Sequence, residues 1–278
     1  MPAVVLIAVA LAALVLYGWL EAGWLRTRVL DVRIRDLPEA LDGLRIGHLS
    51  DFHLGARLSR GNRASERAVA WVAGRRPDIV CITGDLVSHP RGERRLRTLL
   101  ASLPRPYVVL GNHDIAVTRD PFSRAAELRD LDEAVLLRDD VEELELRGHA
   151  IVVAGVDPES YRAGRVLPRA LEPREDAFRL LLCHFPHVVQ KIPPQSFDLI
   201  LAGHLHAGQI CLPFPGRRIT LAHPRAKLTA GLYETAAGTM HVSPGTGTTF
   251  VPFRLFARPE VTELVLRADP GCRSPSRA

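Results

Sequence analysis

Phe197-Asp-Leu-Ile-Leu-Ala-Gly-His-Leu-His206 joins a short apolar run to two histidines that are one residue apart. In an extended strand every second side chain points to the same face, so we expect His204 and His206 to present both imidazoles on one face at the strand end. Two imidazoles on one face can serve two neighbouring metal ions. A site of that kind needs carboxylates from elsewhere in the chain to complete it.

The stretches around this segment alternate between short apolar runs and amphipathic ones. From residue 44 onward we predict strands at 44–50, 78–83 and 107–110, and helices at 63–74, 94–103 and 121–131. The second half is richer in strands, which we predict at 141–146, 150–154, 179–183, 197–202, 240–243 and 261–266. Short strands separated by helices indicate mostly parallel pairing with helices outside. We therefore predict an α/β (α+β) fold with two facing mixed sheets and helices on the outside.

Polar side chains collect where these strands end. They form five segments, whose polar members are Asp51 and His53, Asp85, Asn112 with His113 and Asp114, His184, and finally His204 with His206. Because sites in α/β sheets form at the carboxyl ends of the strands, we expect the five segments to converge. Taken singly, each segment is typical of a turn or a helix cap. We expect the remaining histidines of the chain to lie in turns and caps of that kind. Carboxylates, an amide and imidazoles together suit two divalent ions of manganese, iron or zinc.

The N-terminal stretch is a candidate membrane anchor. Residues 2–20 carry no charge and would form a helix of roughly 28 Å. A cleaved signal peptide and a buried core helix are the alternatives, but no basic residue precedes the run and it continues past Ala10-Leu-Ala12. We predict a single-pass anchor over residues 1–24 at the cell membrane. Arginines 26, 28, 33 and 35 follow it, which favours the cytoplasmic side for the rest of the chain.

Composition limits the remaining possibilities. We predict a linker and lead-in at 25–43, one large domain at 44–267 and a disordered tail at 268–278. The net charge of +5 is spread along the 278 residues and forms no dedicated arm, so we expect no specific nucleic-acid partner. The four cysteines are far apart, which favours free thiols over disulfides or a zinc knuckle.

The five segments resemble, in order, the motif set of the calcineurin-like metallophosphoesterases. The resemblance covers the chain from Leu44 to His206. Three later stretches (208–213, 231–234 and 242–247) make it similar to the membrane-associated bacterial branch with the YkuE and YaeI phosphodiesterases. The chain departs from that pattern at Phe52, where Leu is commoner, and at Ala207, where Gly is common; neither position supplies a ligand.

The resemblance implies a metallophosphoesterase fold, a β-sandwich flanked by helices with the metals above the strand ends. It also implies that the first metal is held by Asp51, His53, Asp85 and His206. Asp85 would bridge to a second metal, which is completed by Asn112, His184 and His204. Two such cations clamp a phosphoryl group and activate a hydroxide for attack on phosphorus. In this scheme His113 protonates the leaving oxygen, and Asp114 orients the His113 imidazole.

The predicted function is hydrolysis of a phosphodiester or pyrophosphate bond by metal-activated hydroxide. With an anchor present, the substrate is expected to be an envelope or lipid-linked compound such as UDP-2,3-diacylglucosamine. Arg217 and Arg218 either meet its anionic head group or are solvated loop charges. Two alternatives remain open: a phosphomonoesterase, nucleotide phosphodiesterase or nuclease of the same fold, and a non-catalytic metal-binding scaffold. The scaffold is disfavoured because Asp85, Asn112 and His113 are all intact.

Overall fold

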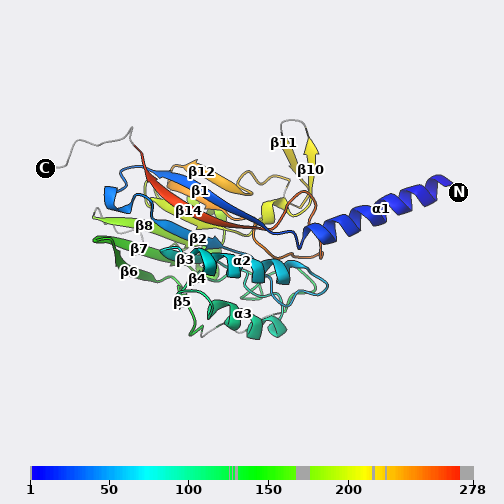
Figure 1. The fold of residues 1–278 in the computed structure, drawn as a ribbon, viewed down its shortest axis with the longest axis horizontal. Helices are drawn as coiled ribbons and strands as arrows, with labels where there is room; N and C mark the ends of the chain where they lie inside the picture. The colour runs from blue at the N-terminus through cyan, green and yellow to red at the C-terminus, as the bar shows by residue number, and fades with distance from the viewer. Residues whose placement is uncertain are drawn as a thin grey trace.

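Two six-stranded sheets pack against each other and carry helices on the outside (Figure 1). The computed structural model describes residues 2–124, 126, 128, 131–166, 176–214, 217–222 and 224–269. This architecture confirms the predicted mixed α/β fold class.

The first sheet has the order β1-β14-β2-β3-β4-β5. Its strands are β1 (Arg26–Ile34), β2 (Arg45–Leu49), β3 (Ile79–Thr83), β4 (Tyr107–Val109), β5 (Val135–Leu136) and β14 (Glu260–Ala268). Strands β2 to β5 pair in parallel, β14 runs antiparallel to β2, and β1 lies parallel to β14. The carboxyl ends of β2, β3 and β4 therefore meet at one edge.

The second sheet has the order β12-β13-β9-β8-β7-β6. Its strands are β6 (Val141–Leu146), β7 (His149–Val156), β8 (Ala177–Cys183), β9 (Leu199–Ala202), β12 (Gly231–Thr235) and β13 (Gly238–Val242). The four central strands are parallel, and an antiparallel hairpin closes each side. A separate hairpin is formed by β10 (Cys211–Phe214) and β11 (Arg217–Thr220).

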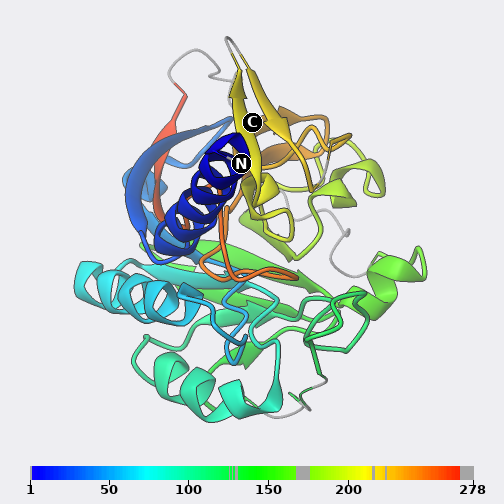
Figure 2. The same cartoon turned by 90° about the vertical axis from the view of Figure 1, so that its right-hand side faces the viewer.

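The helices are α1 (Pro2–Glu21), α2 (Gly61–Arg75), α3 (Glu93–Leu100) and α4 (Pro158–Arg162). Short 3₁₀ turns are η1 (Glu39–Leu41), η2 (Pro90–Gly92), η4 (Pro186–Gln190) and η5 (His206–Gly208). Seen from the end where α1 emerges, α2 and α3 lie next to each other on one outer face (Figure 2).

Successive side chains of β3 pack alternately into the two hydrophobic cores on either side of the first sheet. Ile79 and Cys81 belong to the core between the two sheets, whereas Val80 and Ile82 pack in the core under α2 and α3. Both faces of the strand are thus buried, as expected for a parallel strand in the middle of a sheet. The strand ends at Thr83, and Asp85 follows two residues later in the next loop.

Two predictions of secondary structure are wrong. The described residues of 121–131 form turns and irregular backbone instead of a helix, because Asp120 and neighbouring backbone groups bond to distant segments: the Asp120 carboxylate accepts from Phe250 N–H, and Arg124 N–H donates to the Ser88 carbonyl. The predicted linker at 25–43 contains β1, which pairs over its whole length with β14. Its alternating burial, with Val32 and Ile34 inside, suits a strand at the edge of a sheet.

The end of β14 and the state of the cysteines bear on two further predictions. Strand β14 continues to Ala268, the first residue of the predicted tail; residues 270–278 lie outside the described part of the chain. Cys81, Cys183 and Cys211 are buried free thiols, as predicted; Cys272 is outside the described residues.

Helix α1 extends away from the body of the molecule (Figure 1). It is long and apolar enough to cross a membrane. Its apolar side chains are exposed, which a core helix would not allow. We therefore treat α1 as a candidate membrane span.

Candidate metal centre

The predicted ligands follow strands of both sheets. Asp51, Asp85 and Asn112 come after β2, β3 and β4, whereas His184 and the pair His204 and His206 come after β8 and β9. The facing sheets bring these strand ends together at one side of the sandwich.

The backbone is left-handed at several of these positions. The φ angle is positive at Asp51 (52°), His53 (46°), Asp85 (52°), His204 (74°) and His206 (49°). Non-glycine residues rarely adopt this conformation, and it is concentrated at functional sites. The expectation that His204 and His206 share one face of an extended strand is therefore wrong: β9 ends at Ala202, and the chain turns before each histidine. The two imidazoles reach neighbouring positions through these turns.

All seven predicted ligands lie in two adjoining groups. In the first, ligand atoms of Asp51, His53, Asp85 and His206 all lie within 4.8 Å of one another. Asp85, His184 and His204 form the second group by the same measure. The amide oxygen of Asn112 lies 3.2 Å from His184 Nε2 and so joins the second group. Asp85 is the only residue that belongs to both groups of described residues.

Crowding around His184 indicates that the second group fits a cation. Its Nε2 lies 3.2 Å from Asp85 Oδ2, 3.2 Å from Asn112 Oδ1 and 3.1 Å from His204 Nδ1. One imidazole nitrogen carries at most one proton, which cannot satisfy three acceptors at once. Its Nδ1 donates to the Thr83 carbonyl oxygen (2.8 Å), so Nε2 faces the group and offers its lone pair once its proton is lost. This arrangement suits a divalent ion among the lone pairs.

The charges of the centre are unbalanced in the metal-free protein. Burial raises the pKa of Asp51 to about 7. Burial also opposes the charge on Asp85, but His184 and His113 hold the pKa of this carboxyl well below its usual range. Although burial opposes it, Asp85 raises the pKa of His184 to about 9. Asp85 and His184 therefore form a buried ion pair, in which a proton occupies a place that metal cations can take.

His53 and His206 are poised to receive a cation in a different way. Burial lowers the pKa of both imidazoles well below the usual value, so both rings are neutral. Their Nε2 atoms lie 3.0 Å apart, and His53 Nδ1 lies 2.8 Å from the Ser88 hydroxyl. Neutral imidazole is the form that binds metal ions.

Arg254 is a member of the site that the sequence did not reveal. It is fully buried, and its Nη2 lies 3.1 Å from His206 Nδ1. Since a guanidinium can only donate, His206 Nδ1 is the acceptor and Nε2 carries the proton. Arg254 Nη2 also donates to the carbonyl oxygens of Pro244 and Gly247, while Nε donates to Gly247 and Nη1 to Ala257. Nothing in the local sequence distinguishes this arginine from the many others of the chain.

Two glycines leave room for the carboxylates. A Cβ on Gly111 would lie 2.1 Å from Asp85 Oδ1, and one on Gly203 would lie 2.4 Å from Asp51 Oδ2. Real atoms do not approach so closely, so only glycine allows the backbone to pass beside each carboxylate. Gly111 directly precedes Asn112 and Gly203 directly precedes His204, so both glycines are adjacent in sequence to predicted ligands.

His113 lies beside the first group, with its ring centroid 4.6 Å from that of His53. Its Nδ1 is 2.9 Å from the Ser123 hydroxyl, and its Nε2 is 3.1 Å from Thr118 Oγ1 and 3.3 Å from Thr249 Oγ1. The ring is thus held by hydroxyl groups on both sides. Ser123 and Thr249 come from distant segments, which is why the sequence did not reveal them.

The role predicted for Asp114 is wrong. Its carboxylate accepts hydrogen bonds from the backbone N–H groups of Leu86, Val87 and Gly111, at 2.8 to 3.1 Å. These bonds fasten the loop after Asp85 to the loop before Asn112. Asp114 therefore positions the ligands, and Ser123 contacts the His113 Nδ1 in its place.

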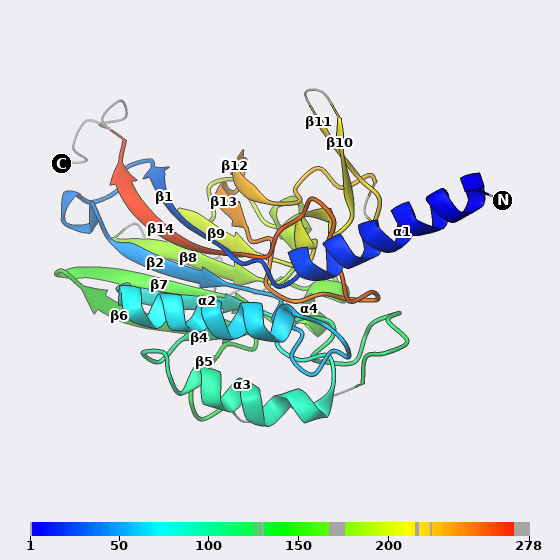
Figure 3. The same cartoon turned by 45° about the vertical axis from the view of Figure 1, so that its right-hand side comes forward.

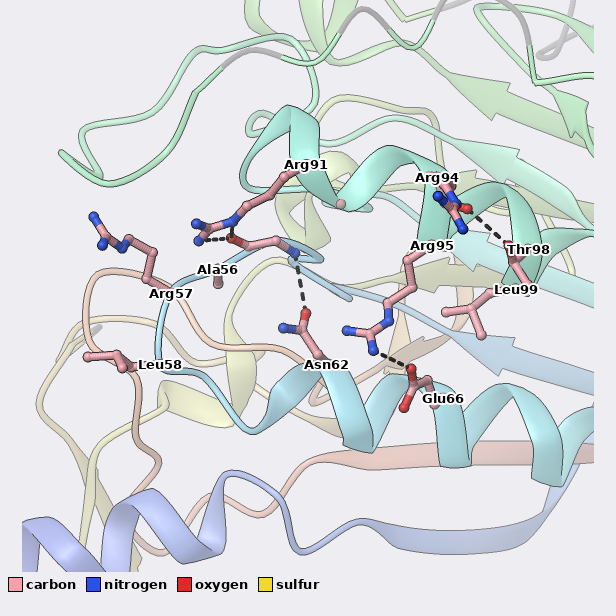
Figure 4. A pocket seen from close by; sticks show the side chains of 12 residues that line it. Ala56, Arg57, Leu58, Asn62, Glu66, Arg91, Arg94, Arg95, Thr98 and Leu99 are labelled. Carbon is pink, nitrogen blue, oxygen red and sulfur yellow. Dashed lines mark hydrogen bonds and ion pairs between the residues drawn. The ribbon is translucent and has the colours of Figure 1, made fainter.

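The predicted contacts of Arg217 and Arg218 cannot be compared, because their side chains lie outside the described part of the structure; their backbone belongs to β11. Other arginines line a pocket of about 690 Å³ between α2 and α3 (Figure 4). They are Arg57, Arg91, Arg94 and Arg95. Gly55, two residues after the ligand His53, lies in the same pocket. This basic pocket therefore includes the start of the loop that follows His53.

Comparisons with known proteins agree with this geometry. The family model for calcineurin-like phosphoesterase matches residues 44–208. Among curated relatives, the metallophosphoesterase YkoQ of Bacillus subtilis is 26% identical over 79% of this chain and 82% of its own length. YkuE of the same organism is 28% identical over 84% of this chain and 82% of its own length. A transmembrane protein with metallophosphoesterase domain from Danio rerio is 33% identical over 86% of this chain, which spans 56% of that relative.

The matched region contains all seven residues of the two groups and His113. The resemblance drawn from the five sequence segments is confirmed, and the two groups of residues are a candidate divalent-metal site at the strand ends of this fold. The chain belongs to the calcineurin-like phosphoesterase family and is a metal-dependent phosphoesterase.

Proposed function

We propose that the protein hydrolyses phosphodiester or pyrophosphate bonds of a membrane-associated substrate with two divalent cations at this centre. The observation that carries the proposal is the position of Asp85, whose carboxylate is within ligand distance of both groups. A carboxylate with two oxygens can bridge two cations, as dinuclear phosphoesterase chemistry requires. Manganese, iron and zinc all suit this set of ligands.

In this proposal each group of residues holds one cation. Asp51, His53 and His206 hold the first, Asn112, His184 and His204 hold the second, and Asp85 binds both. When bound, the cations supply positive charge that stabilises the phosphoryl oxygens and lowers the pKa of water. The protein contributes the fixed orientation of its ligands, which the bonds of Thr83, Ser88 and Asp114 maintain.

His113 is the proposed proton donor to the leaving oxygen. Its Nε2 is directed at the two threonine hydroxyls, and its Nδ1 partner Ser123 accepts or donates as the ring changes its protonation. A proton on Nε2 can pass to the leaving oxygen when substrate replaces a threonine contact. Such general acid catalysis is typically worth about 10²–10⁴-fold.

The positive charge of a nearby pocket and the candidate membrane span support an anionic substrate at a membrane. The arginine-lined pocket includes part of the loop that follows His53, and α1 is a candidate membrane span. A lipid-linked pyrophosphate such as UDP-2,3-diacylglucosamine combines both features, and Arg217 and Arg218 are further candidates to contact its head group. The arginines that follow α1 favour the cytoplasmic side for the catalytic domain.

The test is turnover by the full-length protein in detergent after reconstitution with manganese, iron or zinc. We expect hydrolysis of bis(p-nitrophenyl) phosphate and of UDP-2,3-diacylglucosamine, and weaker hydrolysis of p-nitrophenyl phosphate. Preference for the monoester would make the protein a phosphomonoesterase. Two bound metals without turnover of any of these would favour the non-catalytic scaffold.

A further inference from the structure

An apolar pocket of about 340 Å³ lies beside the metal centre, on the other side of residues 56–58 from the arginine-lined pocket. Leu58, Phe122 and Phe250 line it and are 82%, 65% and 49% exposed. Val251 and Pro252 extend the same wall. Large apolar side chains gathered at an exposed pocket mark a binding surface, since exposing them to water is unfavourable.

The polar side of this pocket is part of the surroundings of His113 and His53. Thr249 lines the pocket and lies 3.3 Å from His113 Nε2. Ser88 lines it as well and lies 2.8 Å from His53 Nδ1. A group bonded to the oxygen that His113 protonates would therefore be next to this pocket.

The rim of the pocket is fastened to the end of α1. The indole N–H of Trp19 donates to the Leu58 carbonyl oxygen (2.8 Å), and Arg254 N–H donates to the Gly18 carbonyl oxygen (3.0 Å). Beside it, the rings of Tyr17 and Phe256 lie 5.9 Å apart. The two segments that form the rim thus lie where the candidate membrane span meets the domain.

Exposed apolar side chains continue on this end of the molecule. Figure 3 shows the β10–β11 hairpin standing beside the base of α1, and it carries the exposed Leu212 and Phe214. Arg57 lies next to Leu58 at the boundary between the two pockets (Figure 4). An apolar pocket and a basic pocket separated by one loop match the two ends of an anionic lipid.

We propose that the apolar pocket binds an acyl chain of a phosphoester lipid taken from the bilayer that α1 spans. This inference rests on the proposed function and adds the chemical class of the leaving group. In the reaction water adds across a P–O bond: its hydroxyl joins phosphorus, and a proton from His113 joins the oxygen of the lipid-bearing group. The arginine-lined pocket faces the anionic part of the same lipid.

The test compares the methyl and dodecyl esters of uridine 5′-monophosphate, both below micelle-forming concentrations, with full-length protein in detergent. We expect kcat/KM to be at least about tenfold higher for the dodecyl ester, an effect equal to burying roughly two methylene groups. Phe122→Gln and Phe250→Asn should each reduce this preference about tenfold. Asparagine is chosen because Phe250 has a φ of 59°, which asparagine tolerates.

Leu232→Gln is the matched control, because Leu232 is 38% exposed but lies on β12, outside the pocket. The inference is overturned if wild-type protein hydrolyses both esters equally, or if the control reduces the preference as much as the pocket variants. Absence of any diester hydrolysis would instead overturn the proposed function. In that event, calorimetry with dodecyl phosphate still tests whether the pocket binds an acyl chain. Equal affinity of wild type and Phe250→Asn for dodecyl phosphate overturns the inference.

Discussion

Two pairs of neighbouring histidines in this molecule have nearly the same geometry and different chemistry. His48 and His241 have ring nitrogens 2.8 Å apart and rings at 71°, and His184 and His204 have nitrogens 3.1 Å apart and rings at 71°. The other nitrogen of His48 meets the Thr83 hydroxyl. In His184 the nitrogen that faces His204, Nε2, also meets the Asp85 carboxylate, and its other nitrogen bonds to the Thr83 carbonyl oxygen.

The carboxylate makes the difference between the pairs. Burial, with the charge of the neighbouring imidazole, holds the pKa of His48 well below its usual range, and burial lowers that of His241 to about 3. His184 is equally buried, yet Asp85 raises its pKa to about 9. Proximity of imidazoles alone therefore does not stabilise a cation here, whereas the Asp85 carboxylate, which belongs to both candidate ligand groups, does.

Removing that carboxylate charge should have the largest effect. Asp85→Asn keeps the shape of the side chain and takes away the bridging charge, so we expect it to lose at least one metal. Its kcat/KM should fall about 10³-fold or more, since a bound cation supplies several kcal/mol of transition-state stabilisation. Metal analysis and diester kinetics measure both quantities, and a variant with two metals and normal kinetics would contradict the shared-carboxylate explanation.

His113→Ala tests whether a histidine beside the ligands has a separate role. We expect both metals to stay bound and turnover of an alkyl ester to fall by about 10²–10⁴-fold, because the leaving alkoxide needs a proton. Turnover of bis(p-nitrophenyl) phosphate should fall much less, since nitrophenolate leaves without one. Loss of metal from this variant would assign His113 to the ligands.

Arg254→Lys should weaken metal binding without removing the site. The guanidinium lies against His206 Nδ1, so its charge favours loss of the Nε2 proton that a metal must displace. Changing a partner of a metal-bound histidine typically costs about 10–100-fold in metal affinity. Competition with a chelating dye measures this, and thermal unfolding of the metal-free protein separates it from misfolding. Unchanged affinity in a folded variant would leave Arg254 with a packing role only.

The smallest effect on activity is expected for the His48–His241 pair. His241→Gln should retain both metals and turn over diesters within about twofold of wild type, since most substitutions away from a site act on stability alone. A rate or a metal content that falls with this variant would place the pair inside the functional centre.

The same variant should change how stability depends on pH. A histidine with a depressed folded pKa contributes its full stability above the unfolded pKa of about 6.5, and loses it as pH falls toward 3, because the unfolded chain then binds the proton. His241→Gln should lower the slope of unfolding free energy against pH by about 1.4 kcal/mol per pH unit in that range. Urea unfolding in detergent at several pH values measures the slope, which would be equal in both proteins if His241 were protonated in the fold.

The sequence predicted the parts of the site that depend on local order along the chain. Apolar runs located β2, β3 and β4 within a few residues, and polar residues after each run identified Asp51, Asp85 and Asn112 as neighbours in space. This works because parallel strands bring their carboxyl ends to one edge whatever the details of the loops.

Features that depend on contacts between distant segments were not predictable. Arg254 reaches His206 from the loop before β14, and Ser123 reaches His113 from a stretch predicted to be helical. Asp114 is adjacent to His113 in sequence but turns to the backbone of Leu86 and Val87. Adjacency in sequence suggested the wrong partner, because a buried carboxylate is best satisfied by several converging N–H groups.

The most direct test of the shared-carboxylate centre is an anomalous-scattering measurement on crystals of the full-length protein grown with Mn²⁺. We expect two peaks roughly 3.5–4 Å apart, one on each side of the Asp85 carboxylate, with His206 next to one and His184 next to the other. A single peak, or two peaks of which neither contacts Asp85, would contradict the account.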